Sequence, residues 1–368
     1  MHIWNIGLLG SVAILLLIMG NACGEKIIYR CPPCNQPCDT LTFDSPGMCP
    51  HCSMPLEKVH NPSETRLAPI NEINIQEGKG YFRVSGGKGK TDKVIDVHYY
   101  KPDFTFDKLQ VLLVIPGAGR NGDSYRDAWV EEADRNRWLI LSPTFREEDY
   151  PFEHYHLCGL IDDINLQESA TYSDSSNEVY LAESTLRFDP VVDIEKWIFN
   201  DLDRIFLLVK DEFGLDQSKY NVFGHSAGGQ ILHRMALLHN GSLTGQIIAA
   251  NSGFYTLPDT TTSLPFGLKD FPFSEEQMKR AFQNQVVILS GELDNAEETG
   301  GTLLRSTSAD IQGMHRNERA HFFFNYAQEM AKEKGIPFHW KLVEVPNVGH
   351  DHRGMGKAAA KYLEGLSN

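Results

Sequence analysis

Short apolar runs of strand length alternate with amphipathic helical stretches from about residue 81 to the end of the chain. The runs at 111–115 and 286–289 are apolar at every position, which is typical of parallel strands buried on both faces. The runs at 81–84 and 93–100 instead alternate apolar and polar residues, as half-exposed antiparallel strands do. This pattern predicts an α/β fold, in which a mostly parallel sheet is flanked by crossover helices.

Eight strands and three long helices are expected. The strands are residues 81–84, 93–100, 111–116, 138–142, 220–223, 246–250, 286–290 and 340–345. Apolar side chains recur at helical spacing in three stretches, 194–213, 317–334 and 357–366. Residues 145–189 break the alternation and are expected to form a long loop, whose aromatic and histidine-rich start predicts a wall of a substrate cleft.

The pentapeptide Gly-His-Ser-Ala-Gly at residues 224–228 lies between the expected strand 220–223 and a helix. Glycine on both sides of the serine permits a sharp turn, because a Cβ atom at either position would collide there. The turn holds the serine in a strained conformation that projects its hydroxyl. The following helix directs its N-terminal amides toward negative charge near the serine. We therefore predict that Ser226 is a nucleophile.

A serine nucleophile needs a base, and the base needs an orienting carboxylate. Asp294 follows the buried run 286–290, and His350 ends a short loop after the expected last strand. The chain order Ser, Asp, His is the order expected when the nucleophile lies on a strand-to-helix turn of this kind. We assign Asp294 as the acid and His350 as the base, with Glu292 and His352 as the respective alternatives.

The loop at 117–122, which follows the expected strand 111–116, contains three glycines. Glycines let backbone N–H groups approach a bound group without interference from side chains. The amides predicted to hold an oxyanion are those of Ala227 and Ala118, with Gly119 as the alternative to Ala118. The loop lacks both the Gly-Lys-Ser/Thr ending of a P-loop and the glycine spacing of a dinucleotide site, so we do not expect it to bind phosphate.

Four stretches, residues 115–125, 223–230, 291–294 and 349–350, resemble the polyhydroxyalkanoate depolymerase and feruloyl esterase group of α/β-hydrolases. The resemblance implies an α/β-hydrolase domain at 79–368. It also implies hydrolysis of carboxylic esters through an acyl-enzyme, with no metal or organic cofactor in catalysis. One departure is that the loop after the third strand begins Pro-Gly here, where the group usually has His-Gly.

Residues 1–22 contain an apolar run at 6–19 and no acidic residue. This run is about as long as the apolar core of an export signal and shorter than the roughly 20 residues that a membrane-spanning helix needs. Small residues followed by Cys23 resemble a bacterial lipoprotein cleavage site. We expect 1–22 to be a lipoprotein-type signal peptide and Cys23 to be lipidated, with ordinary signal cleavage or an uncleaved anchor as alternatives. The expected location is the bacterial cell envelope, on the periplasmic or outer face of a membrane.

Five of the seven cysteines lie within residues 31–52, which indicates a local metal site or local disulfides. Two C-x2-C pairs are separated by a spacing close to that of zinc ribbons, in which four thiolates surround the metal. The four candidate ligands are Cys31, Cys34, Cys49 and Cys52. Cys38 is a fifth candidate.

Residues 29–32 and 46–56 resemble the short heavy-metal-binding domain found beside copper-transport and related bacterial envelope proteins. The resemblance implies a metal-binding module at 27–58, which we expect to be followed by a linker at 59–78. A set of thiolate ligands favours structural zinc, whereas His51 and Met54 leave copper open.

These features together predict an exported serine esterase that acts on small or oligomeric esters. One alternative is a peptidase or amidase that uses the same triad. Another is a metal-binding envelope lipoprotein whose hydrolase-like body is not catalytic. The formal charge of −15, with no stripe of Lys and Arg to reverse it locally, excludes nucleic acid as an expected partner.

Overall fold

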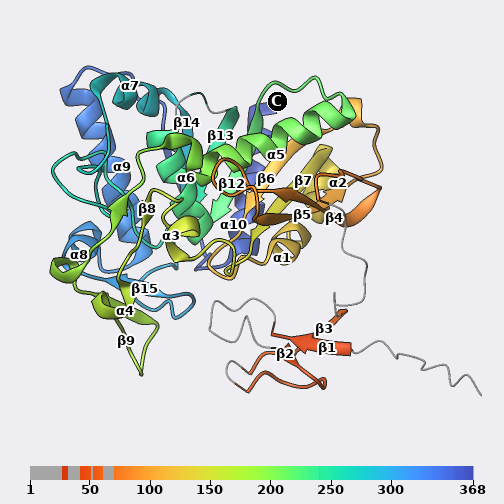
Figure 1. The fold of residues 1–368 in the computed structure, drawn as a ribbon, viewed down its shortest axis with the longest axis horizontal. Helices are drawn as coiled ribbons and strands as arrows, with labels where there is room; N and C mark the ends of the chain where they lie inside the picture. The colour runs from red at the N-terminus through yellow and green to blue at the C-terminus, as the bar shows by residue number, and fades with distance from the viewer. Residues whose placement is uncertain are drawn as a thin grey trace, which may run out of the picture.

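The computed structural model describes residues 27–31, 42–50, 53–60, 70–239, 241 and 243–367. It contains one large sheet with helices on both faces, and a separate small sheet that precedes it in the chain (Figure 1). The predicted signal peptide, Cys23, Cys34 and Cys52 lie outside the described residues.

The large sheet is built from the eight strands predicted from the sequence. In spatial order they are β16 (Lys341–Val345), β14 (Gln285–Gly291), β13 (Thr244–Ala250), β12 (Tyr220–His225), β6 (Gln110–Ile115), β7 (Trp138–Phe145), β5 (Val94–Lys101) and β4 (Gly78–Ser85). All neighbouring strands pair in parallel except β5, which is antiparallel to β4 and to β7. The predicted α/β class is therefore confirmed.

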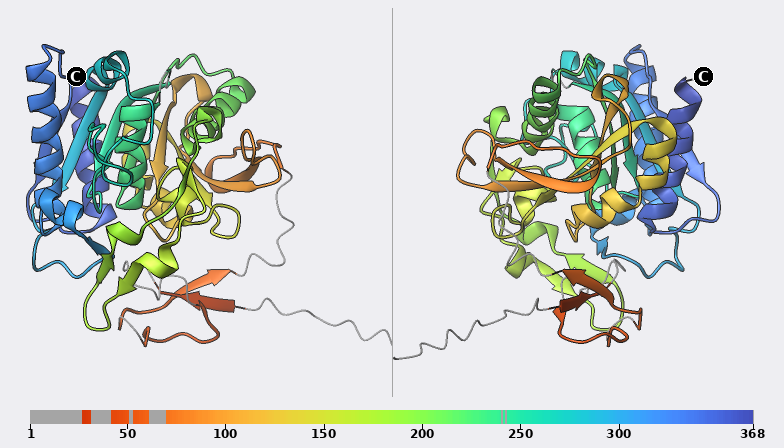
Figure 2. Two further views of the ribbon diagram at one scale, coloured as in Figure 1. Left: turned by 60° about the vertical axis from the view of Figure 1, so that its left-hand side comes forward. Right: turned by 90° about the vertical axis from the view of Figure 1, so that its right-hand side faces the viewer.

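Two apolar cores lie on opposite faces of this sheet, which explains why central strands are apolar at every position. In β6, the side chains of Val111, Leu113 and Ile115 belong to one core and those of Leu112 and Val114 to the other. One face is covered by α5 (Ile198–Phe213), α6 (Ala227–Leu238), α7 (Glu275–Gln283) and α9 (Arg316–Glu333). The other is covered by α1 (Gly122–Asp127), α2 (Val130–Asn136) and α10 (His352–Ser367) (Figure 2).

Two helices differ from their predicted bounds. The helix expected at 194–213 is interrupted at Trp197, whose backbone is extended and whose buried indole N–H donates to the Val191 carbonyl oxygen at 2.9 Å. Helix α10 begins at His352 and not at 357, because the Asp351 carboxylate accepts hydrogen bonds from the first backbone N–H groups. His352 is therefore a helical residue.

The segment 145–189, expected to form a long loop, contains several short helices and strands. The segment contains α3 (Phe152–Tyr155), β8 (Ile161–Asp162), α4 (Leu166–Ser169), β9 (Ala170–Tyr172), β10 (Glu178–Leu181) and β11 (Asp189–Pro190). Strand β10 pairs with β9 and, in parallel, with β15 (Leu303–Arg305), which comes from the segment after β14. A pairing between segments so distant in sequence leaves no local pattern. We call the segment 145–197 the insertion.

The small sheet contains β1 (Ile27–Arg30), β2 (Thr42–Phe43) and β3 (Glu57–His60), all antiparallel, in the order β2-β1-β3. The side chains of Cys31 and Cys49 are buried together in an apolar cluster with Met54. Backbone hydrogen bonds between Cys49 and Met54 and between Ser53 and Cys49 close a turn after Cys49. This arrangement places the first cysteine of each C-x2-C pair in one cluster.

The end of the predicted linker packs against the large sheet and its core. Ile75 is buried in the core, and Ile70 forms a bridge with Arg83 of β4. Residues 70–77 therefore belong structurally with the large sheet.

Gly228 in the first turn of α6 gives a test of this packing. A Cβ atom there would overlap the carbonyl oxygen of Ile115 and lie 2.8 Å from that of Pro116. We expect Gly228→Ala to push α6 away from β6 and to lower the free energy of unfolding by about 1–3 kcal/mol. Thermal denaturation measures this loss. Gly365→Ala is the control, since nothing lies within 4 Å of a Cβ atom at this helical position, and alanine there should not destabilise the protein.

Candidate active site

Ser226 forms the turn between β12 and α6. Its backbone angles, φ 57° and ψ −115°, lie in a region that costs a residue other than glycine about 1–3 kcal/mol. Its N–H donates to the Ala250 carbonyl oxygen, and its own carbonyl oxygen accepts from the Gln230 N–H, both at 2.9 Å. A Cβ atom on Gly224 would lie 2.5 Å from the Gly228 carbonyl oxygen. The strained turn expected from the sequence is therefore present and held on both sides.

The loop after β6 passes beside this turn. A Cβ atom on Gly117 would lie 3.4 Å from the Cβ of Ser226. The Arg120 N–H donates to the Gly117 carbonyl oxygen at 3.0 Å, which closes a tight turn on which Ala118 is exposed. Ala227 is the first residue of α6, and the first N–H groups of a helix have no partner within it. Both segments predicted to supply oxyanion amides thus lie next to Ser226.

Residues at the start of the insertion form hydrogen bonds with the loop after β6. The Tyr155 hydroxyl donates to the Pro116 carbonyl oxygen at 2.7 Å, and the Arg120 guanidinium lies 4.7 Å from the centroid of the Tyr155 ring. Arg120 also donates to the carbonyl oxygens of Phe145 and Tyr150. The start of the insertion therefore borders the candidate site.

Asp294 and His350 form a buried pair. The His350 Nδ1 lies 2.8 Å from the Asp294 Oδ2, and the two side chains are 0% and 1% exposed. Burial raises the pKa of Asp294, but the charges of His350 and Arg316 outweigh it and hold that pKa below its usual range. Burial and then the charge of Arg316 lower the pKa of His350, against the opposing effect of Asp294. The lowered pKa favours the neutral imidazole, which is the form that accepts a proton.

The two alternative residues, Glu292 and His352, have other partners. Glu292 accepts a hydrogen bond from a backbone N–H in the loop before His350, at 2.8 Å. The His352 ring stacks on Tyr125 with 4.3 Å between centroids, and burial lowers the pKa of His352 to about 4. The structure thus places Asp294, and not Glu292, beside His350.

His225 connects the nucleophile turn to the buried pair. Its ring centroid lies 4.6 Å from that of His350, and its Nδ1 lies 3.1 Å from the Tyr125 hydroxyl. Burial, followed by the nearby charge of His350, lowers the pKa of His225 well below its usual value. His225 is therefore a neutral ring packed between Tyr125 and His350, one residue before Ser226.

Asn251 is a buried residue of the site that the sequence analysis missed. Directly after β13, it adopts a left-handed φ of 45°, accepts from the Gly291 N–H and donates to the Gly349 carbonyl oxygen, each at 2.8 Å. It thereby ties the strand end beside Ser226 to the segments before Asp294 and His350. An asparagine after a strand is the only local signal, because asparagine tolerates this φ.

Arg316 is the second residue that the sequence analysis missed. Its Nη1 donates to the Asp294 Oδ1 at 3.0 Å, and its Nη2 donates to the carbonyl oxygens of Gly301 at 2.9 Å and Thr302 at 3.0 Å. The side chain is 2% exposed. An arginine in the first turn of an amphipathic helix gives no sequence signal of such a role.

The proposed metal ligands are described only in part. Across the described ranges, no three or more His, Cys, Asp or Glu side chains gather as a metal-binding group. Cys31 and Cys49 lie in one buried cluster, which is compatible with a zinc ribbon, whereas Cys34 and Cys52 lie outside the described residues. The metal site stays a prediction.

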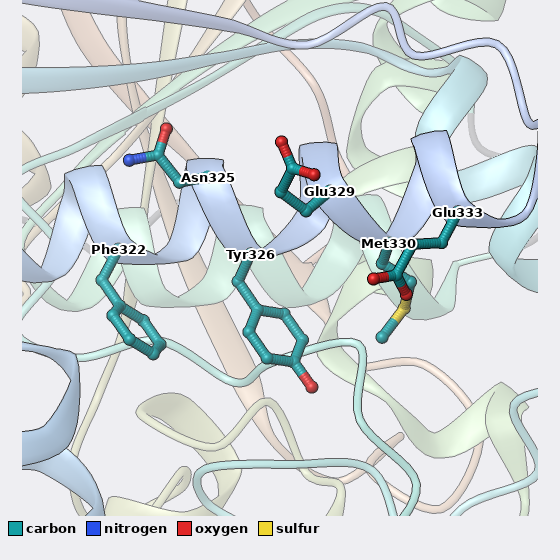
Figure 3. Close-up of a pocket in the computed structure, with 6 residues that line it drawn as sticks. All are labelled: Phe322, Asn325, Tyr326, Glu329, Met330 and Glu333. Carbon is teal, nitrogen blue, oxygen red and sulfur yellow. The ribbon is translucent and has the colours of Figure 1, made fainter.

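A separate surface groove of about 410 Å³ runs along α9 (Figure 3). Its lining is Phe322, Asn325, Tyr326, Glu329, Met330 and Glu333. None of Ser226, Asp294 and His350 lines it, so we assign it no part in the chemistry around Ser226.

A nucleophile-type serine turn on an eight-stranded, mostly parallel sheet defines an α/β-hydrolase fold. The chain is similar to the solved structure of poly(aspartic acid) hydrolase-1 from Sphingomonas sp. KT-1, with 32% identity and a TM-score of 0.66. The match covers 78% of this chain and 98% of that one. The chain therefore belongs to the same α/β-hydrolase family as that enzyme.

A second solved structure is LpqC, a poly(3-hydroxybutyrate) depolymerase from Bordetella parapertussis. It is 28% identical with a TM-score of 0.66, and the match covers 79% of this chain and 90% of that one. No protein-family model and no curated protein matches the chain. Both structural relatives are hydrolases, which supports a hydrolase activity for this chain.

Asn251→Ala tests the polar connection within the site. The substitution leaves the Gly291 N–H and the Gly349 carbonyl oxygen without their partner, at about 1–3 kcal/mol for each buried group. We expect a lower melting temperature and lower turnover by the folded protein, because Asp294 and His350 lose their common support.

The matched control is Asn221→Ala. The Asn221 Oδ1 accepts from the Gln246 N–H at 2.9 Å and so joins β12 to β13 at their amino ends. This variant should lose stability but retain turnover. An equal loss of turnover in the two variants would contradict the role given to Asn251.

Proposed function

We propose that the chain is a serine esterase with Ser226 as nucleophile, Asp294 as acid and His350 as base. The observation that carries the proposal is the strained Ser226 turn at the same sheet edge as the buried Asp294–His350 pair. The three residues follow β12, β14 and β16, whose carboxyl ends lie at the same edge of the parallel sheet, which supports their assignment to one site. The two hydrolase relatives support the same reaction class.

In the proposed mechanism His350 Nε2 accepts the Ser226 hydroxyl proton as Oγ attacks the ester carbonyl carbon. Asp294 stays ionised, holds the imidazole through Nδ1 and stabilises the imidazolium. The N–H groups of Ala227 and Ala118 bind the oxyanion. His350 then gives the proton to the departing alcohol, and water attacks the acyl-enzyme with His350 again as base, which releases the acid and restores Ser226.

The test of the nucleophile is labelling by a fluorophosphonate probe, followed by mass spectrometry of the labelled peptide. We expect wild-type protein to be labelled at Ser226 and Ser226→Ala to lose labelling, with turnover lower by about 10⁴-fold or more. Ser142→Ala is the control, because Ser142 is a buried serine of β7 that donates to the Val114 carbonyl oxygen. Labelling of Ser226→Ala at the wild-type rate would refute the assignment.

The lowered pKa of His350 predicts the pH dependence of the reaction. Only the neutral imidazole acts as base, so kcat/KM falls as pH drops through this pKa. We expect the acid limb of kcat/KM to lie below the pH expected for an unperturbed histidine. A pH profile on a neutral p-nitrophenyl ester measures it, and an acid limb above the ordinary histidine value would contradict the assignment of His350 in this buried environment.

Amide hydrolysis is the second candidate. The relative at 32% identity is named for poly(aspartic acid), a polymer joined by amide bonds, whereas LpqC is named for a polyester. Ester and anilide substrates with the same acyl group, in a series of acyl lengths, separate the two. Higher kcat/KM on the esters supports the esterase, and higher kcat/KM on the anilides supports the amidase.

We propose further that the protein is exported to the bacterial cell envelope and anchored through lipidated Cys23, with structural zinc bound at residues 27–58. No helix in the part of the chain that the structure describes is long and apolar enough to cross a membrane. Mass spectrometry of the mature N-terminus tests acylation of Cys23. Metal analysis of purified protein, compared with Cys49→Ser, distinguishes zinc from copper and from a metal-free disulfide state.

A further inference from the structure

We propose that Arg316 is a positioning residue for the reaction. It fixes the Asp294 carboxylate in the orientation that serves His350, and it fixes the backbone of residues 301–302 against the imidazole. This inference rests on the proposed function, because it concerns residues that act on Ser226.

The Asp294 carboxylate is divided between two buried partners. Its Oδ2 pairs with His350 and its Oδ1 with Arg316. Two partners on opposite oxygens prevent rotation of the carboxylate plane, whereas one partner does not. Because the three side chains are nearly inaccessible to water, no solvent molecule can replace the guanidinium without local opening.

The Arg316 Nη2 contacts the backbone that packs against the His350 ring. Gly301 has a φ of 64°, and a Cβ atom there would lie 2.8 Å from the His350 Cδ2 and 2.9 Å from its Nε2. The carbonyl oxygens of Gly301 and Thr302 both accept from the Arg316 Nη2. One planar guanidinium therefore positions the carboxylate at one side of the imidazole and the backbone at the other, which a point charge such as lysine cannot do.

The same guanidinium acts on the charge of the base. Titratable and charged groups face His350 from four parts of the fold: the segment after β14, α9, β12 and α10. They are Asp294, Glu298, Arg316, His225 and His352. Arg316 lowers the pKa of His350, while Asp294 and Glu298 raise it. Removing the guanidinium charge should therefore move the acid limb of the reaction to higher pH.

Helix α9 provides a matched control in Arg319, three residues further along. Its side chain is also fully buried, and it donates to the carbonyl oxygens of Gly313, Gly253 and Leu304. Its guanidinium also lies 3.4 Å from the Asp310 carboxylate, and within the described residues it forms no hydrogen bond with Asp294 or His350. Loss of Arg319 therefore removes a comparable buried cation from the same helix but no hydrogen bond to Asp294 or His350.

The experiment compares the full-length variants Arg316→Met, Arg316→Lys and Arg319→Met with wild type. For each, kcat and KM are measured across pH with a neutral p-nitrophenyl ester, together with the melting temperature. We expect Arg316→Met to lose about 10-fold or more in kcat with little change in KM, since misplacement by about 1 Å can cost roughly 100-fold. Its acid limb should move to higher pH.

Arg316→Lys retains the charge but not the planar fork, so its acid limb should stay near that of wild type while kcat falls. Arg319→Met should lose thermal stability and keep the wild-type acid limb and the kcat of the folded protein. The proposal is wrong if Arg316→Met keeps the wild-type acid limb and loses no more kcat than Arg319→Met.

If Arg316→Met does not fold, Arg316→Lys alone is sufficient for the test, and an unchanged kcat in that variant overturns the proposal. Failure of wild-type protein to react with the fluorophosphonate at Ser226 refutes the proposed function instead. If wild-type protein is labelled normally and the Arg316 variants keep the wild-type kcat and acid limb, only the positioning role is refuted.

Discussion

Helix α6 approaches the carboxyl ends of β6 and β13 so closely that neither Gly228 nor Gly229 has room for a side chain. A Cβ atom on Gly229 would lie 2.6 Å from the Ala250 carbonyl oxygen, as one on Gly228 would overlap Ile115. This close packing places Ser226 between the loop after β6 and the end of β13. The strain in its backbone is maintained because both neighbouring strands are buried and cannot yield.

Burying the Asp294 carboxylate is unfavourable on its own, and the fold compensates it with two partners. A buried ion pair of this kind adds little net stability, but removing one partner leaves an uncompensated charge. We therefore interpret the contacts among Asp294, His350 and Arg316 as fixing the positions of the carboxylate and the imidazole and as shifting the pKa values of Asp294 and His350. Asn251 holds the backbone of the same region in place, since its amide side chain joins Gly291 to Gly349.

The sequence predicted those parts of the protein whose signals are local. The eight strands were recognisable because each is a continuous or alternating apolar run. The Ser226 turn and the Asp294–His350 contact could be anticipated because each of these residues follows such a strand. Arg316 and the pairing of β10 with β15 could not be predicted, since their partners lie far away in the sequence. Helix α10 begins earlier than expected because Asp351 caps it, and a prediction based on the spacing of apolar residues does not detect such a cap.

The parallel pairing of β10 with β15 has a mechanical consequence. Strand β15 continues directly from Thr302, and Asn177 before β10 donates to the Gly301 carbonyl oxygen at 2.8 Å. The insertion and the backbone that packs on His350 are thus one continuous unit. The strand pair and Asn177 therefore connect the outer surface of the insertion to the backbone that packs on the imidazole.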